Sequence, residues 1–436
     1  MNILQKTIKS IQSSFASYVE VTNASGIDVN PILKSLDTLN TRPTYKTIDN
    51  LEYIAFGRQD DVDLMIDKLN YKSSTHSGII TKKAKMISGS GLIVNSELIG
   101  GKNARLQTLL KHAGGAGVTL YSVITKLAYE YTRSGAVGLI VDFGDVKDGK
   151  SVPDGIVRMT VAPARHMRMG RPANDGDPIT EIIYKKSFKT GALVGPAEAI
   201  PLFNPFEVQK RAIVYIGNPY TVFDSYSVPN WIGAFNFIEA DYEFGVQIEN
   251  SAKNGFAPKT HVTMIGRNMS KQEKQTAAAA IQDTLSGSRG DQVAVSFVAR
   301  ETEKPIIDKI ESNNLDSLIE TMSRLNDAKI LTAHNVTSPT LFGVITTGQA
   351  LGGTGTELLS AFNLFKATEV IPDRRIILDA VRNVFEVTEL ANVEMEIIDP
   401  DITVDYKTKP VEGGNTEKNP NVGKANTEPK PLTKAS

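Results

Sequence analysis

The sequence contains no cysteine in its 436 residues. The absence excludes disulfides, thiolate metal ligands and a catalytic thiol. No apolar run approaches the roughly 18–20 residues that a membrane-spanning helix requires, so we expect no membrane partner. Neither sign of charge dominates, because 48 Lys and Arg stand against 49 Asp and Glu, for a net charge of −1. The chain therefore has no overall attraction to nucleic acid, and we expect a soluble cytoplasmic product.

Familiar catalytic and metal-binding patterns are also missing. The five histidines are scattered, and neither H-E-x-x-H nor G-x-S-x-G occurs. These are the patterns of zinc proteases and of serine hydrolases. Carboxylate clusters such as 60–63 and 399–401 favour turns or solvated faces over acid/base pairs. We therefore expect no enzymatic activity, no cofactor and no bound metal.

Glycines concentrate in TTGQALGGTGTELL, residues 346–359, which leads into an apolar helical pattern. A glycine-rich turn before a helix is typical of phosphate cradles. However, Thr354 stands where a P-loop needs lysine, and Leu358 stands where the dinucleotide motif needs glycine. Glu357 is the only formal charge between Lys329 and Lys366, whereas affinity for a polyanion grows with nearby cations. The stretch is either an ordinary connector or a loop that touches a partner without binding it tightly.

The first half of the chain has the pattern of a mixed α+β module. Apolar residues at helical spacing predict a helix within 73–92, ended by Gly89 and Gly91, and a second helix over 119–133. The apolar run AVGLIVDF predicts a buried strand over 136–143, and further strands are expected at 156–163, 179–188 and 211–216. Lys82, Lys83 and Lys85 lie largely off the apolar face of their helix. This is typical of a solvated face, with a DNA or partner contact as the alternative.

A long helix is predicted between Pro229 and Gly255, the favoured residues near a helix start and just after its end. At 1.5 Å per residue it would be a rod of roughly 37 Å. Apolar residues occupy several of its faces, which indicates burial on several sides. The helix is either a central core element or wedged between neighbouring copies. One stripe holds Trp231, Phe235, Ile238 and Tyr242.

A β-α-β insert separates this helix from a second one. Strands are predicted at 259–266 and 291–298, with a helix at 270–287 that begins with a Ser270–Glu273 capping box. The second long helix covers 314–334. After the glycine stretch we expect a helix to about residue 371, a break at Pro372, a short amphipathic helix and a last strand at 393–399. The last residues of the chain, from Lys407 to Ser436, are expected to be disordered or extended.

This order of elements resembles the portal proteins of tailed bacteriophages, which connect head to tail. The resemblance covers residues 45–400 and is carried by the collinear series, since no single motif is diagnostic. Its segments are SSTHSGIITKKAKMISGSGL, SYSVPNWIGAFNFIEADYEFGVQIENSAKNGFAP, LDSLIETMSRLNDAKILTAHNVTSPTLFGV and GTELLSAFNLFKATEVIPDRRIILDAV.

The resemblance implies a portal-like subunit with a wing, a helical stem, a small α/β clip and a tunnel loop and helix, assembled as a ring. The implied parts are: 1–228 wing, 229–255 first stem helix, 256–313 clip, 314–338 second stem helix, 339–355 tunnel loop, 356–405 tunnel helix with the return to wing or crown, and 406–436 flexible C-terminal tail.

The resemblance also implies a function and partners. The ring, expected to be a dodecamer, would occupy one capsid vertex of the virion, after synthesis in the host bacterial cytoplasm. It would pass double-stranded DNA without sequence specificity, and contact the terminase, the head–tail adaptor and the major capsid protein. The motor ATPase would belong to the terminase. Alternatives are a nucleotide-binding enzyme that uses 346–356 and another structural ring or adaptor component.

Two groups of residues receive implied roles. The DNA-facing tunnel loop would contain Thr346, Thr347, Gly348, Gln349, Gly352, Gly353, Thr354 and Gly355. The subunit interface of the stem would contain Trp231, Phe235, Ile238 and Tyr242. Acidic stem residues would repel phosphate if they face the channel; these are Glu239, Asp241, Glu243 and Glu249.

Overall fold

The computed structural model divides into two compact units, Met1–Pro400 and Asp401–Ser436. The second unit lies outside the described residues, as do residues 1–42. The structure describes residues 43–95, 103–145, 155–174, 176–189, 192–220, 225–254, 260–265, 269–285, 293–298, 315–343, 355–388, 390–391 and 393–400.

A three-stranded antiparallel sheet forms the centre of the body. Strand β4 (Ala136–Phe143) lies between β5 (Ile156–Pro163) and β9 (Arg211–Gly217). Ile140 pairs with Thr160 on one side and with Ile213 on the other. Seven of its eight residues are buried, because a central strand covered on both faces needs an uninterrupted apolar run. All three of these predicted strands are confirmed.

Three smaller sheets complete the strands of the body. The predicted strand at 179–188 is shorter, because only β7 is extended there. The hairpin β1–β2 and the pairing of β3 with β12, which joins residues some 300 positions apart, were not expected from sequence. The strands are β1 (Tyr45–Ile48) with β2 (Leu51–Ile54), β6 (Met167–Met169) with β7 (Glu181–Tyr184) and β8 (Glu198–Pro201), and β3 (Gly91–Asn95) with β12 (Glu394–Ile398).

Helices cover this sheet system, and α4 is in contact with several of them. The helix expected within 73–92, with its end at Gly89 and Gly91, is confirmed: α4 ends at Ser88, because Gly89 has φ +63° and breaks the helical path. Helix α4 packs on α6, α9 and α11. The helices of this group are α3 (Val62–Lys72), α4 (Ser74–Ser88), α5 (Asn103–His112) and α6 (Leu120–Ser134).

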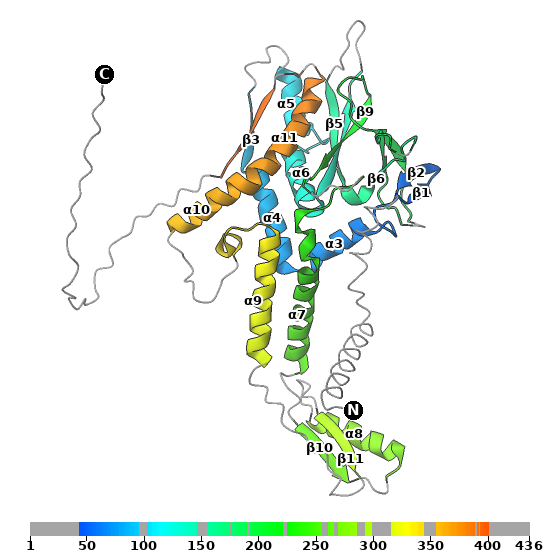
Figure 1. Ribbon diagram of the computed structural model, residues 1–436, viewed down its shortest axis with the longest axis vertical. Coiled ribbons are helices and arrows are strands. Elements are labelled where there is room, and N and C mark those ends of the chain that lie inside the picture. Colours follow the sequence, from blue (N-terminus) through cyan, green and yellow to red (C-terminus); the bar gives the residue numbers. More distant parts are fainter. Residues whose placement is uncertain are drawn as a thin grey trace, which may run out of the picture. The chain divides into compact units, whose positions relative to one another are not determined.

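The two long helices lie side by side (Figure 1). The first begins as a 3-10 turn, η4 (Asn230–Ala234), and continues as α7 (Phe235–Asn254). The second is α9 (Leu315–Ala333). The side-chain amide of Asn326 on α9 donates to the carbonyl of Phe237 on α7 at 2.8 Å. Both predicted helices are confirmed, and a direct hydrogen bond joins them.

The insert between the long helices has the expected β-α-β order. Strands β10 (Thr260–Ile265) and β11 (Val293–Val298) pair in parallel, and α8 (Lys271–Leu285) connects them. The capping box is present, because the Ser270 amide donates to Glu273 and the Glu273 amide donates to the Ser270 hydroxyl. Helix α8 packs on β11.

The prediction of a break at Pro372 is wrong. Helix α10 (Gly355–Phe365), a π segment called η8 (Lys366–Val370) and helix α11 (Ile371–Glu386) follow one another without interruption. Proline has no N–H to offer to the carbonyl of Thr368, four residues earlier, and its ring crowds that carbonyl. The wider π turn accommodates both defects, so the chain passes the proline while staying helical.

Most residues of the predicted tunnel loop, Thr346–Thr354, lie outside the described residues. Before them, the 3-10 turn η7 (Pro339–Phe342) ends at Gly343, and after them Gly355 is the first residue of α10. The mixed α+β class is confirmed. The boundaries of wing, stem, clip and tunnel parts stay predictions.

Substitution of Gly135 tests the close contact between the end of α6 and the backbone of Val228. It ends α6 with φ +71°, and a Cβ added there would lie 2.2 Å from the backbone carbon of Val228. The left-handed conformation alone costs a non-glycine residue about 1–2 kcal/mol. We expect Gly135→Ala to lower the free energy of unfolding by at least about 2 kcal/mol in urea titrations.

The control for this experiment is Gly78→Ala in α4, where nothing lies within 4 Å of an added Cβ. Alanine in an exposed helix interior should raise the stability by about 0.5–1 kcal/mol. Equal effects of the two substitutions would contradict the structure around Gly135.

Candidate functional site

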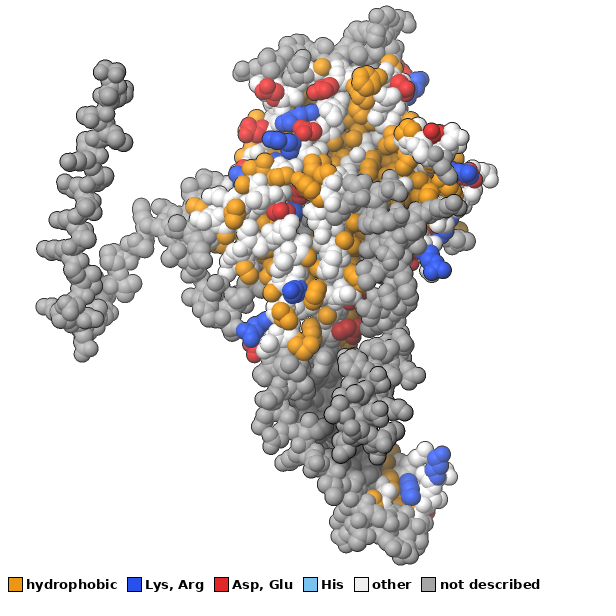
Figure 2. All heavy atoms as spheres, viewed as in Figure 1, with side chains coloured by type: hydrophobic (Ala, Val, Ile, Leu, Met, Phe, Trp, Pro, Cys, Tyr) orange, Lys and Arg blue, Asp and Glu red, His pale blue; other side chains and the backbone are white. Residues whose placement is uncertain are grey.

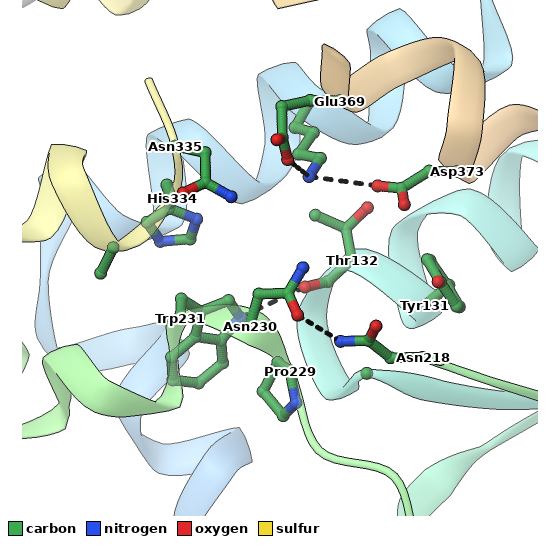
Figure 3. Close-up of a pocket in the computed structure, with 13 residues that line it drawn as sticks. Tyr131, Thr132, Asn218, Pro229, Asn230, Trp231, His334, Asn335, Glu369 and Asp373 are labelled. Atoms are coloured by element: carbon green, nitrogen blue, oxygen red, sulfur yellow. Dashed lines mark hydrogen bonds and ion pairs between the residues drawn. The ribbon is translucent and has the colours of Figure 1, made fainter. Parts of the chain in front are cut away.

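A small cavity lies where α4, α6, η4, the end of α9, η8 and α11 meet (Figure 3). We call it the junction. Its volume of about 30 Å³ can hold two or three water molecules, each of which needs about 10–15 Å³, and no nucleotide. Its lining residues are Lys83, Tyr131, Thr132, Gly135, Asn218, Pro229, Asn230, Trp231, Ala333, His334, Asn335, Glu369 and Asp373.

Lys83 is ion-paired with two carboxylates in the junction. Its Nζ lies 3.0 Å from Glu369 Oε2 and 3.1 Å from Asp373 Oδ2, and only 9% of its side chain is exposed. Burial lowers the pKa of Lys83, but Asp373 and Glu369 outweigh it and the net direction is upward. Burial raises the pKa of Asp373 against the opposing effect of Lys83. The protonated ammonium group of Lys83 therefore lies between two acidic side chains.

This arrangement corrects the interpretation of the lysines as a solvated face. Lys82 and Lys85 are exposed, but Lys83 is buried. The apolar stripe of α4 faces α6, whereas Lys83 faces η8 and α11, so the helix is covered on more than one side. The helical spacing of apolar residues identifies only the apolar face of α4, and it does not show that the face with Lys83 is also covered.

Two buried histidines meet beside this ion cluster. His76 Nδ1 and His334 Nε2 are 2.9 Å apart, which places one proton between them. The Trp231 ring packs edge-on against His76 with centroids 4.3 Å apart. Burial lowers the pKa of His76 to about 3, and burial, His76 and Lys83 lower the pKa of His334 well below its usual range. Both imidazoles are therefore neutral at pH 7, and His76 Nε2 has no hydrogen-bond partner.

Three residues of the predicted interface stripe belong to the chain's own core. Trp231, Phe235 and Ile238 are almost completely buried, and the Trp231 indole N–H donates to the Thr132 carbonyl at 3.2 Å. Side chains that are already buried within one subunit cannot form the contact with a neighbouring subunit. Tyr242 is 45% exposed, with the Lys72 ammonium 5.4 Å from its ring centroid. The interface role stays a prediction that now concerns Tyr242.

The start of the first long helix is tied to the body by two asparagines. Asn218 donates to Asn230 Oδ1 at 2.6 Å and to the Val228 carbonyl at 3.2 Å.

Glu239, which we expected to repel phosphate, forms an ion pair with Lys72 of α3. Its charge is therefore partly neutralised within the chain.

Sequence analysis named Lys83 and Trp231 but did not predict that they meet the other residues of this junction. Glu369 and Asp373 are four residues apart, so both lie on one face of a helix, and this spacing was the available signal. His76 and Lys83 are seven apart on α4 and also share a face. Neither pattern says that the two faces meet. The structure brings together Lys83, Glu369, Asp373, His76 and His334, and places the predicted Trp231 next to them.

The described part of the chain contains no group of three or more His, Asp or Glu side chains placed to hold a metal ion. No helix there is both long and apolar enough to cross a membrane.

Comparisons with known proteins give distant likenesses only. No family model and no curated protein matches the chain. Among solved structures it is similar to a chain from the virion of the native gene transfer agent particle, with 14% identity, 87% of this chain and 91% of that chain covered, and a TM-score of 0.49.

Two further structures come from the neck of such particles. A chain from the empty particle, computed with C6 symmetry, has 15% identity, covers 87% of this chain and 91% of its own, and gives a TM-score of 0.49. A chain from the native particle, computed with C12 symmetry, has 15% identity, covers 86% and 89%, and gives 0.48. Likeness at this level establishes no function.

Removal of Lys83 tests the ion cluster. Lys83→Met leaves Glu369 and Asp373 together without a cation, and breaking a buried pair in this way costs about 3–5 kcal/mol. We expect that loss in the free energy of unfolding at pH 7. The matched control Lys83→Met/Glu369→Gln/Asp373→Asn has no unpaired charge and should recover most of it. A single variant as stable as the wild type would contradict the buried pairing.

The histidine pair predicts a pH dependence. A histidine with a lowered folded pKa stabilises the fold in its neutral form, fully above the unfolded pKa of about 6.5 and progressively less as pH falls toward about 3. Between pH 7 and pH 5 each neutral histidine should account for a loss of about 2 kcal/mol.

The measurement is the difference in unfolding free energy between wild type and His76→Gln/His334→Gln across this range. The wild type should lose more stability on acidification. His112→Gln, which alters an exposed histidine, should keep the wild-type slope. Parallel pH profiles for wild type and the double variant would exclude the neutral pair.

Proposed function

We propose that the chain is the subunit of a ring-shaped portal through which double-stranded DNA enters and leaves a phage-like capsid. The observation that carries the proposal is the series of elements around the junction. An α+β body leads into α7, a β-α-β insert follows, α9 returns beside α7, and the helical run 355–386 comes next. This is the order that the resemblance to portal proteins implies for wing, stem, clip and tunnel helix.

Exposed apolar side chains on the long helices support assembly into a ring. Met322 and Leu325 on α9 are 47% and 60% exposed, and α7 exposes residues on a different part of the pair. Met322 and Leu325 are three residues apart and therefore share one face of α9, and exposed apolar side chains that lie together are typical of interaction sites. A contact between two different faces, repeated with closing rotation, gives a ring. The exposed residues of α7 are Phe237, Tyr242 and Ile248.

The proposed partners follow from that role. The ring would be a dodecamer at one capsid vertex of the virion, bound to the major capsid protein. The insert would contact the terminase during packaging and the head–tail adaptor afterwards. The chain itself would catalyse no reaction, and the terminase would hydrolyse ATP. Structures of gene transfer agent particles with neck chains solved under C6 and C12 symmetry agree with a ring, but at TM-scores under 0.5 they do not carry the proposal.

The described residues of the junction and of the glycine stretch do not favour the enzyme alternative. The cavity at the junction is too small for a nucleotide, and the glycine stretch proposed for phosphate lies outside the described residues.

Electron microscopy of the purified full-length chain tests the proposal. Top views should show closed rings with a central hole, because the exposed faces of α7 and α9 become covered on assembly. Met322→Glu/Leu325→Glu places charges in that contact and should yield single subunits. Val157→Glu, at another exposed apolar residue, is the control and should leave the rings intact. Single subunits in the wild type under capsid-assembly conditions would overturn the proposal.

A further inference from the structure

We propose that His76 and His334 form an acid-sensitive switch, which holds the end of α9 against α4 in neutral solution and releases it on acidification while the central sheet stays folded. His76 lies on α4, and His334 directly follows the last residue of α9. The two helices pack on each other at this point. The inference stands on the contacts of this pair alone and does not rest on the proposed function.

The proton between the two rings can be assigned to one of them. His76 Nδ1 and His334 Nε2 are 2.9 Å apart, whereas His76 Nε2 is buried and has no hydrogen-bond partner among the described residues. Unpaired buried N–H groups are rarer in proteins than unpaired acceptors. We therefore assign the proton to His76 Nδ1, which donates it to His334 Nε2.

A further proton does not fit this closed arrangement. On His76 it would occupy Nε2, where no described residue accepts it. On His334 it would occupy Nε2, which already faces the N–H of His76. Both rings are buried, and a buried charge without a partner carries a large free-energy cost. The rings therefore become charged readily only when they separate and water reaches them.

The ammonium group of Lys83 also opposes a charge on the pair. It lowers the pKa of His334, in addition to burial and the effect of His76. The carboxylates that η8 and α11 contribute, Glu369 and Asp373, lie 3.0 and 3.1 Å from Lys83 Nζ and neutralise that ammonium. The cluster beside the pair therefore favours neutral imidazoles.

Groups on η4, α6 and α9 also face this site. Trp231 of η4 and Tyr131 of α6 line the junction as neutral rings, since burial raises the pKa of Tyr131. On α9, Asp327 accepts a hydrogen bond from the Thr75 hydroxyl at 2.9 Å. Burial raises the pKa of Asp327 and of Asp373, so their protonation favours the closed state and works against opening. The effect of the histidines is therefore measured against a variant that lacks them.

Hydrogen exchange of the full-length protein at pH 7 and pH 5 tests the switch. The neutral pair stabilises the closed state fully above the open-state pKa of about 6.5 and progressively less as pH falls toward about 3. The reference variant is His76→Gln/His334→Gln, whose amides can form a hydrogen bond but stay uncharged. Beyond any change in this variant, protection of the wild-type amides at 330–334 should fall roughly 25-fold for each histidine, while β4 stays protected.

The single tryptophan of the chain gives a second measurement. Trp231 is 2% exposed and its ring centroid lies 4.3 Å from that of His76. Its fluorescence emission should shift to longer wavelength between pH 7 and pH 5 in the wild type, because opening brings water to the indole. The same shift should be absent from the double variant.

Two kinds of control keep the test decisive. His112→Gln, at an exposed histidine, should respond to pH like the wild type. The single variants His76→Gln and His334→Gln each retain one ring and should keep a fall of roughly 25-fold, so they decide the outcome if the double variant does not fold. Equal protection at 330–334 in the wild type and the histidine variants at pH 5 overturns the proposal. A simultaneous loss of protection in β4 also overturns it, because acid would then unfold the whole body.

Discussion

A lysine buried among helices has to keep its counter-charges, and the centre of this structure is arranged around that constraint. Lys83 cannot leave Glu369 and Asp373 without exposing a buried charge to an apolar surrounding, which costs far more than losing a surface ion pair. Since Lys83 lies on α4 and its partners lie on η8 and α11, the pairing fixes how the helical run 355–386 sits on the body. The π segment places Glu369 and Asp373 so that one ammonium reaches both.

Periodicity predicted the elements but not their contacts. The strand AVGLIVDF, the two long helices and the capping box at Ser270 followed from local rules, because apolar spacing and caps act within a few residues. Lys83 was assigned to a solvated face because its partner lies 286 residues away, and no local pattern reports on that partner. The break expected at Pro372 failed for a related reason, since packing against the body stabilises a helix that propensity alone would end.

The long helix α7 combines both interpretations that its sequence left open. Trp231, Phe235 and Ile238 at its beginning are covered by the chain's own body, whereas Tyr242 and Ile248 further along are exposed. The apolar residues of this helix are therefore buried in the core at its beginning and exposed on the surface further along. Sequence could not place the division, because it depends on where the body ends and not on any property of the helix itself.

Helix α4 connects the body with the long helix pair. It contacts α6 in the body, α9 of the long pair, and both η7 and η8. Close apolar packing already resists a shift of these helices, because a shift would leave voids between interdigitated side chains. At the junction a shift would also separate Lys83 from its carboxylates and the two neutral histidines from each other, which leaves buried polar groups without partners. Directional polar contacts therefore add to the resistance of this connection, and in the ring that we propose they would oppose the separation of helix 355–386 from α4.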